Sequence, residues 1–166
     1  MTGRLAMGVE YDGSAYCGWQ FLKHAPSVQG AVEKALARVA SVPIRIHASG
    51  RTDSGVHATR QVIHFDAPVP RSQKAWVFGV NANLPRDIAV RWVREVPDDF
   101  HSRFKALARR YRYVLLNQPS RPVLERANVT WCRDPLDADA MHRAAQVLVG
   151  EHDFSSFRAA GCQSKT

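Results

Sequence analysis

Residues 44–66 read IRIHASGRTDSGVHATRQVIHFD. Apolar and polar side chains alternate at Ile44–Ala48 and again at Gln61–Asp66, and the residues between these stretches are mostly small or polar. Alternation is typical of β-strands, because successive side chains of a strand point to opposite faces of the sheet. We therefore predict a hairpin of two strands joined by an exposed loop at residues 50–57.

The stretches on either side of this hairpin predict four further elements. Ser27 is a suitable N-cap for one helix, and Ser72 precedes a second. The predicted elements are a half-buried strand at residues 4–11, a helix at 28–39, a helix at 73–81 and a strand at 88–96. With the hairpin, the order becomes β-α-β-β-α-β, which is typical of the split βαβ, ferredoxin-like fold of the α+β class. We expect this fold in an N-terminal domain at residues 1–105.

The remaining residues predict the beginning of a second α/β unit. Apolar alternation predicts strands at Leu107–Leu116 and Asn128–Cys132, and Asp137 is a suitable N-cap for a helix that ends before Gly150. The residues after this helix supply no further strand. We therefore expect an incomplete C-terminal domain at residues 106–166.

Composition favours a soluble protein with a polyanionic partner. The chain carries 23 Lys and Arg residues against 15 acids, a net charge of +8. No stretch approaches the roughly 20 apolar residues of a membrane span. Its three cysteines are widely spaced and lack a metal-ligand pattern. We expect a cytoplasmic location and no contact with a membrane.

The strongest signal for chemistry is Asp53, which lies between Gly50 and Gly55. Glycines permit the backbone conformations and close approaches of a loop that faces a ligand. In an extended loop Arg51 and Asp53 point the same way, and a nearby guanidinium favours the ionised carboxylate. Asp53 is then suited to nucleophilic attack. The alternative is an Asx-type turn residue that pairs with an arginine and has no catalytic role.

Positive charge is concentrated between His101 and Tyr113, where no acid occurs. Aromatic residues are interleaved with the basic ones, which are Arg103, Lys105, Arg109, Arg110 and Arg112. Basic side chains neutralise phosphates and aromatic rings stack on unpaired bases, so this stretch favours an RNA loop as partner. The alternative is a strand with a solvated basic face and aromatics in the core.

Neither a metal site nor a Ser–His dyad is favoured by the remaining polar residues. His47, His57 and His64 lack a convergent set of further ligands, so we expect no metal. Ser54 and His57 lack the orienting acid and oxyanion site that a nucleophilic serine needs.

Six runs along the chain, in order, resemble motifs of one family. They are Tyr11–Gln20, Gly50–Ala58, Asn81–Pro85, Phe100–Phe104, Arg110–Tyr113 and Asp153–Arg158. On these motifs the chain resembles the family of tRNA pseudouridine synthase A, and the agreement of several ordered motifs is more specific than any one. Family members extend beyond Thr166 with a second half similar to the first, so the resemblance implies a chain truncated at its C-terminus.

The resemblance implies an isomerase that converts uridine to pseudouridine at positions 38, 39 and 40, in the anticodon stem-loop of tRNA. It further implies a homodimer that needs no cofactor. Asp53 matches the nucleophile, which attacks C1′ or acts on the sugar to form a glycal. Arg51 matches the arginine that pairs with it and helps to flip the base, and Tyr111 matches a tyrosine against the target uracil. The positions implied to contact tRNA are Arg51, Arg71, Phe100, His101, Ser102, Arg103, Phe104, Arg109, Arg110, Gly161, Cys162, Gln163, Ser164 and Lys165.

Two other functions remain open from the sequence. One is a non-catalytic RNA-binding fragment of such an enzyme, which keeps the basic stretch but lacks the second wall of the cleft. The other is an unrelated hydrolase or transferase with an aspartyl intermediate, although the sequence shows no phosphate-binding loop and no pair of acids for magnesium.

Overall fold

Strand β1 (Gly3–Tyr11) lies inside a four-stranded antiparallel sheet. In the computed structural model, which describes residues 1–157, β1 pairs with β3 (Ala58–Ala67) on one side and with β4 (Ile88–Glu95) on the other. The short β2 (His47–Ala48) pairs with β3 at one edge, which gives the order β2-β3-β1-β4. This is the topology of a ferredoxin-like βαββαβ fold, so the predicted fold class is confirmed.

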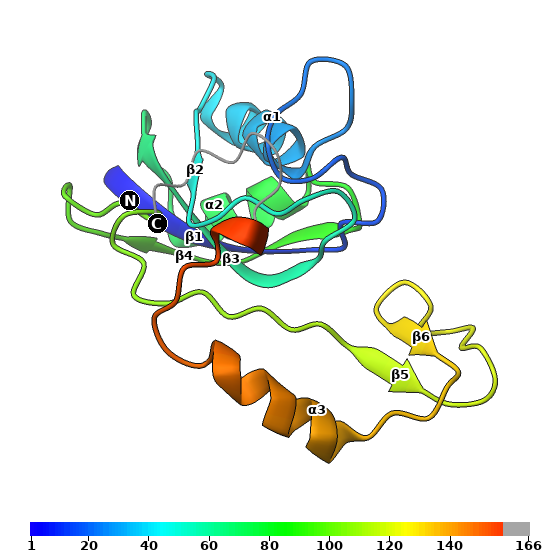
Figure 1. Cartoon of the computed structure of the whole chain (residues 1–166). Helices are drawn as coiled ribbons and strands as arrows, with labels where there is room; N and C mark the ends of the chain where they lie inside the picture. The colour runs from blue at the N-terminus through cyan, green and yellow to red at the C-terminus, as the bar shows by residue number, and fades with distance from the viewer. Residues whose placement is uncertain (158–166) are drawn as a thin grey trace. The chain divides into compact units, whose positions relative to one another are not determined.

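Helices α1 (Val28–Ala40) and α2 (Gln73–Asn81) lie side by side on one face of this sheet (Figure 1). Both begin at a serine N-cap. The hydroxyl of Ser27 accepts the Gly30 N–H at 3.3 Å, and that of Ser72 accepts the Ala75 N–H at 3.1 Å. Each cap satisfies an N–H group that has no partner within its helix.

The core lies between the sheet and the two helices. From β1 it takes Leu5, Met7 and Val9, all fully buried, and from the helices it takes Leu36 and Trp76 among others. The prediction that β1 is half-buried is wrong, because Ala6 and Gly8 on the opposite face are buried as well. The indole of Trp92 in β4 lies directly against Gly8 and covers this face.

Strand β2 is shorter than the stretch Ile44–Ala48 that alternation predicts. Ile44 and Ile46 are buried in the core as expected. However, the Ile46 N–H donates to the Glu33 carboxylate of α1 at 3.2 Å instead of to β3. A side chain thus replaces the sheet as hydrogen-bond partner, and regular pairing begins only at His47.

The chain divides into two compact units, Met1–Tyr111 and Arg112–Thr166. Within the second unit, β5 (Leu115–Asn117) and β6 (Thr130–Cys132) form a parallel pair. Helix α3 (Ala138–Ala145) follows, and two 3-10 turns, η1 (Gln146–Leu148) and η2 (Ser155–Phe157), come after it. The helix begins at Asp137, whose carboxylate accepts the Ala140 N–H at 2.9 Å, as predicted.

The predicted strand Leu107–Leu116 is wrong over most of its length, since regular pairing starts only at Leu115. The residues before Leu115 are held by a side chain instead of by strand pairing. The Arg109 guanidinium donates to the carbonyl groups of Ser49 and Arg103. These side-chain bonds hold an irregular segment. Within the described part of the chain, residues 107–114 pair with no strand.

The division into domains after residue 105 stays a prediction. Among residues 1–157, no helix has the length and apolar character needed to cross a bilayer.

Candidate active site

Asp53 lies at a tight turn of the loop that joins β2 and β3. The Val56 N–H donates to the Asp53 carbonyl at 3.2 Å, and Gly55 has a φ of 79°. Only glycine adopts such a positive φ without strain, because it has no Cβ. The Asp53 side chain is exposed, so a substrate has access to its carboxylate.

A second loop, residues 12–20, packs against the first backbone to backbone. A Cβ on Gly18 would lie 2.7 Å from the Thr52 carbonyl oxygen, and one on Gly13 would lie 2.1 Å from the Val56 oxygen. The Trp19 N–H donates to the Thr52 carbonyl at 2.9 Å. Glycine at both positions therefore allows the second loop to support the peptide groups around Asp53.

Side chains from the sheet hold the loop from its buried side. The Tyr11 hydroxyl lies 2.7 Å from Thr52 Oγ1. Gln61 Nε2 donates to the Gly50 carbonyl, and Gln61 Oε1 accepts from the Ser49 hydroxyl, each at 2.6 Å. Burial raises the pKa of Tyr11 above its ordinary value, so its hydroxyl keeps its proton.

The end of the loop is held by Asp12 and His57. His57 Nδ1 lies 3.0 Å from the Asp12 carboxylate and 3.2 Å from the Gly13 nitrogen. The hydroxyl and N–H of Ser14, together with His57, lower the pKa of Asp12. The expectation that His57 lacks an orienting acid is therefore wrong, because Asp12 lies against its Nδ1. The Ser54 hydroxyl donates to the Tyr16 carbonyl at 3.2 Å.

Arg51 and Asp53 are both exposed, whereas Thr52 between them turns toward Tyr11. This alternation agrees with the expectation that Arg51 and Asp53 share one side of an extended segment. Among the described residues, the ion pairs do not include one between Arg51 and Asp53. The predicted pairing of the two side chains is therefore absent here.

Two residues of the basic stretch reach this loop. Arg109 donates to the Ser49 carbonyl through Nε at 2.8 Å and through Nη2 at 2.7 Å. The Tyr111 hydroxyl lies 3.8 Å from the place that a Cβ on Gly50 would take, and its side chain is 74% exposed. The structure thus places the ring of Tyr111 near the start of the loop that carries Asp53, with much of its surface available for stacking.

The segment Phe100–Phe104 divides into exposed and buried members. Arg103 and Phe104 are exposed, and the Arg103 guanidinium lies 5.7 Å from the Phe104 ring centroid. Ser102 is 3% exposed; its hydroxyl lies 2.9 Å from His64 Nδ1 and donates to the His47 carbonyl. Through these two contacts Ser102 links the segment to β2 and β3. A contact of its side chain with RNA stays a prediction.

The remaining residues predicted to contact RNA are Arg71, Arg110 and five residues near the end of the chain. Arg71 donates to the Val39 carbonyl near the end of α1, at 3.3 Å. Arg110 is exposed. Gly161, Cys162, Gln163, Ser164 and Lys165 lie outside the described residues.

Comparison with known proteins decides the family of the chain. Residues 7–105 match the family described as tRNA pseudouridine synthase. The chain belongs to the tRNA pseudouridine synthase family. It is 58% identical over 163 residues to the tRNA pseudouridine synthase A of Shigella boydii serotype 4 (strain Sb227), covering 98% of this chain and 60% of that protein. The same values relate it to the tRNA pseudouridine synthase A of Escherichia coli O1:K1 / APEC. The chain thus spans about 60% of the length of these relatives.

Sequence reasoning missed the side chains that hold the loop of this tRNA pseudouridine synthase domain. The sequence predicts a strand for Tyr11 and for Gln61, and it supports only a family motif for Gly13 and Gly18. The glycines at 13 and 18 are the one local signal in that motif from which a backbone-to-backbone contact could have been predicted. The partner of each side chain became evident only from the fold.

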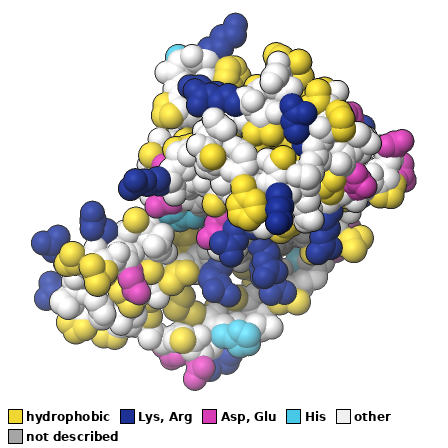
Figure 2. All heavy atoms as spheres, turned by 180° about the vertical axis from the view of Figure 1, so that it is seen from behind, with side chains coloured by type: hydrophobic (Ala, Val, Ile, Leu, Met, Phe, Trp, Pro, Cys, Tyr) yellow, Lys and Arg dark blue, Asp and Glu magenta, His cyan; other side chains and the backbone are white. Residues whose placement is uncertain are grey.

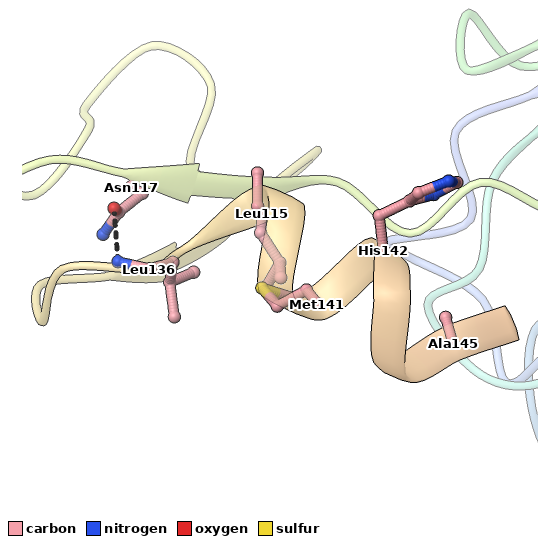
Figure 3. A pocket seen from close by; sticks show the side chains of 7 residues that line it. Leu115, Asn117, Leu136, Met141, His142 and Ala145 are labelled. Atoms are coloured by element: carbon pink, nitrogen blue, oxygen red, sulfur yellow. Dashed lines mark hydrogen bonds between the residues drawn. The ribbon is translucent and has the colours of Figure 1, made fainter.

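Two other features of the structure do not point to catalysis. A cavity of about 630 Å³ in the second unit is lined mainly by apolar side chains of β5 and α3, and His142 is its only titratable lining residue (Figure 3). Within residues 1–157, no group of His, Cys, Asp and Glu is arranged to hold a metal ion.

Lys and Arg side chains outnumber acidic ones on one face of the molecule. Figure 2 shows them there in separate groups between hydrophobic and neutral side chains. This distribution accords with the excess of 23 basic over 15 acidic residues.

Proposed function

We propose that the chain carries the catalytic loop of a tRNA pseudouridine synthase and that Asp53 is its nucleophile. The observation that supports this proposal is the exposed Asp53 carboxylate on a loop held from two sides, in a chain of this family. A loop fixed in this way presents a carboxylate to a substrate without the entropic cost of ordering it during the reaction.

The proposed reaction is an isomerisation in which atoms balance. The bond between N1 of uracil and C1′ of the ribose breaks, and a bond between C5 and C1′ forms. C5 loses its proton and N1 gains one. Asp53 bonds to C1′ as a nucleophile or removes a proton from C2′ to form a glycal. The base must leave its stack for either route, and stacking on Tyr111 would supply about 1–3 kcal/mol toward holding it.

The substrate in this proposal is tRNA, with the target uridines at positions 38, 39 and 40 of the anticodon stem-loop. The basic stretch supplies phosphate contacts through Arg103, Arg109 and Arg110. We further propose that the protein works as a homodimer in the cytoplasm, as the resemblance to its family implies.

Release of tritium from tRNA that carries 5-³H-uridine tests the function, because the C5 hydrogen leaves when C5 bonds to C1′. We expect release by the wild-type protein and none above background by Asp53→Asn, which keeps the size of the side chain but not its charge. The assay is run with the 166-residue chain and with the complete product of its gene. Release by the complete product alone would still support the role of Asp53.

Asp98→Asn is the matched control, since Asp98 is an exposed aspartate of the same unit outside the loop. It is expected to release tritium at the wild-type rate. The proposal fails if neither wild-type protein releases tritium, or if Asp53→Asn retains turnover.

A further inference from the structure

Three of the four residues before Asp53 are held by two side chains of the sheet. Gln61 on β3 holds Ser49 and Gly50, and Tyr11 at the end of β1 holds Thr52. Both holding residues are buried, with Gln61 7% and Tyr11 3% exposed. A buried polar group needs a partner, so these contacts favour one arrangement of the loop over others.

We propose that Tyr11 and Gln61 are positioning residues that set the direction of the Asp53 carboxylate by holding the loop at Ser49, Gly50 and Thr52. The predicted effect on catalysis rests on the proposed function. The predicted effect on the conformation of the loop rests on the hydrogen bonds alone. In this proposal both residues act through the loop, since both are buried beneath it.

The direction of Asp53 follows from the side-chain alternation around Thr52. Thr52 turns its hydroxyl inward to Tyr11, and its neighbours Arg51 and Asp53 are exposed. If the Thr52 side chain is released, the peptide group before Thr52 can rotate, and Arg51 and Asp53 lose part of their orientation. The Trp19 N–H still holds the Thr52 carbonyl, so the loop is expected to loosen rather than unfold.

Tyr11 itself is fixed by its surroundings. Its ring is part of the buried core and lies 5.7 Å from that of Trp19. Tyr11→Phe therefore removes the hydroxyl and leaves the ring in place. Burial also raises the pKa of Tyr11, which favours the protonated hydroxyl that lies 2.7 Å from Thr52 Oγ1.

The first test measures the loop directly and needs no catalysis. Arg51 is exposed, and trypsin cleaves after it only when the loop opens. We expect Tyr11→Phe to raise the rate of cleavage between Arg51 and Thr52 about tenfold, while cleavage after the exposed Arg91 in β4 stays unchanged. Tyr11→Phe leaves the sequence around the cleaved bond intact. Equal rates at Arg51 in the two proteins would overturn the proposal.

The second test is a double-mutant cycle on tritium release. A small displacement of a catalytic group is enough to cost about 10- to 100-fold in kcat. We expect losses in this range for Tyr11→Phe and Thr52→Val, with KM for tRNA within about twofold of wild type. Because both changes break the same contact, the double variant should lose no more than either single one. Additive losses, or an unchanged kcat, would contradict the proposal.

Three further variants separate positioning from a general loss of structure. Thr52→Ser keeps the hydroxyl and should retain most of the activity. Gln61→Met removes both hydrogen bonds at similar size and should lower kcat as Tyr11→Phe does. Thr59→Val is the matched control for Thr52→Val, since Thr59 is exposed on β3. If neither the 166-residue chain nor the complete gene product releases tritium, the proposed function is refuted, whereas the cleavage at Arg51 would still decide the role of Tyr11.

Discussion

Gly18 packs closely against the peptide groups around Asp53 because it has no side chain. Gly18 has a φ of +87°, and a Cβ there would meet the Thr52 oxygen at 2.7 Å and the Asp53 carbonyl carbon at 3.2 Å. Gly55 also has a positive φ, +79°, but no atom lies within 4 Å of its virtual Cβ. The two glycines thus share a positive φ, but only Gly18 is packed closely against neighbouring atoms.

This difference predicts unequal effects of alanine at the two positions. Gly55→Ala should lower the free energy of unfolding by about 1–2 kcal/mol, the cost of a left-handed conformation. Gly18→Ala carries the same cost and about 1–3 kcal/mol more, because the loop must move away from the new methyl group. Urea unfolding of both variants measures the difference. Equal losses would show that the two loops do not pack as described.

At the scale of elements, His64 joins β3 to the segment Phe100–Phe104. Its ring lies 5.0 Å from that of His47 on β2 and 4.5 Å from that of His101, and Ser102 contacts its Nδ1. Burial, together with the charges of His101, His47 and Arg4, lowers the pKa of His64 to about 4, with Asp66 opposing the shift.

A lowered histidine pKa predicts stability that depends on pH. The unfolded chain binds a proton near pH 6.5, and the folded chain only near pH 4. The stability from neutral His64 is therefore complete above about pH 6.5 and is lost as pH falls toward 4, by at most about 3 kcal/mol. We expect His64→Gln to flatten this part of the profile in urea unfolding. An unchanged slope between pH 4 and 6.5 would contradict the assignment.

A second prediction at this scale concerns the contact of β1 with β4. A Cβ on Gly8 would lie 2.1 Å from Trp92 Nε1, so the indole has no room for a methyl group. Gly8→Ala should lower the free energy of unfolding by about 1–3 kcal/mol. Adding Trp92→Leu should recover part of this loss, because the smaller side chain relieves the overlap. A double variant less stable than the sum of the two changes would refute the contact.

The sequence predicts an element well when its hydrogen-bond partners are close in the sequence, and poorly when they are distant. The helices at Ser27 and Ser72 were predicted because their caps and apolar faces are local. Leu107–Leu116 was mispredicted as a strand because alternation does not supply a partner strand. The contact of Tyr11 with Thr52 joins residues 41 positions apart. No local pattern reveals such a pair, although the same patterns revealed the exposed loop and Asp53.

At the scale of the whole molecule, the excess of basic residues predicts salt-sensitive binding of tRNA. Each phosphate contact contributes about 0.7–0.9 to the slope of log affinity against log salt concentration. Arg110 is exposed in the basic stretch, so Arg110→Gln should weaken binding and reduce that slope by about one contact. Arg38→Gln, at an exposed arginine of α1 that donates to Asn83, is the control and should leave the slope unchanged. Equal slopes for wild type and Arg110→Gln would remove Arg110 from the proposed surface.

The most direct measurement of the central claim is to map pseudouridine by mass spectrometry in unmodified tRNA after incubation with the protein. The account predicts pseudouridine at positions 38, 39 and 40 with wild type, none with Asp53→Asn, and the wild-type pattern with Asp98→Asn. Pseudouridine formed by Asp53→Asn, or no product from the wild-type chain and from the complete gene product, would contradict it.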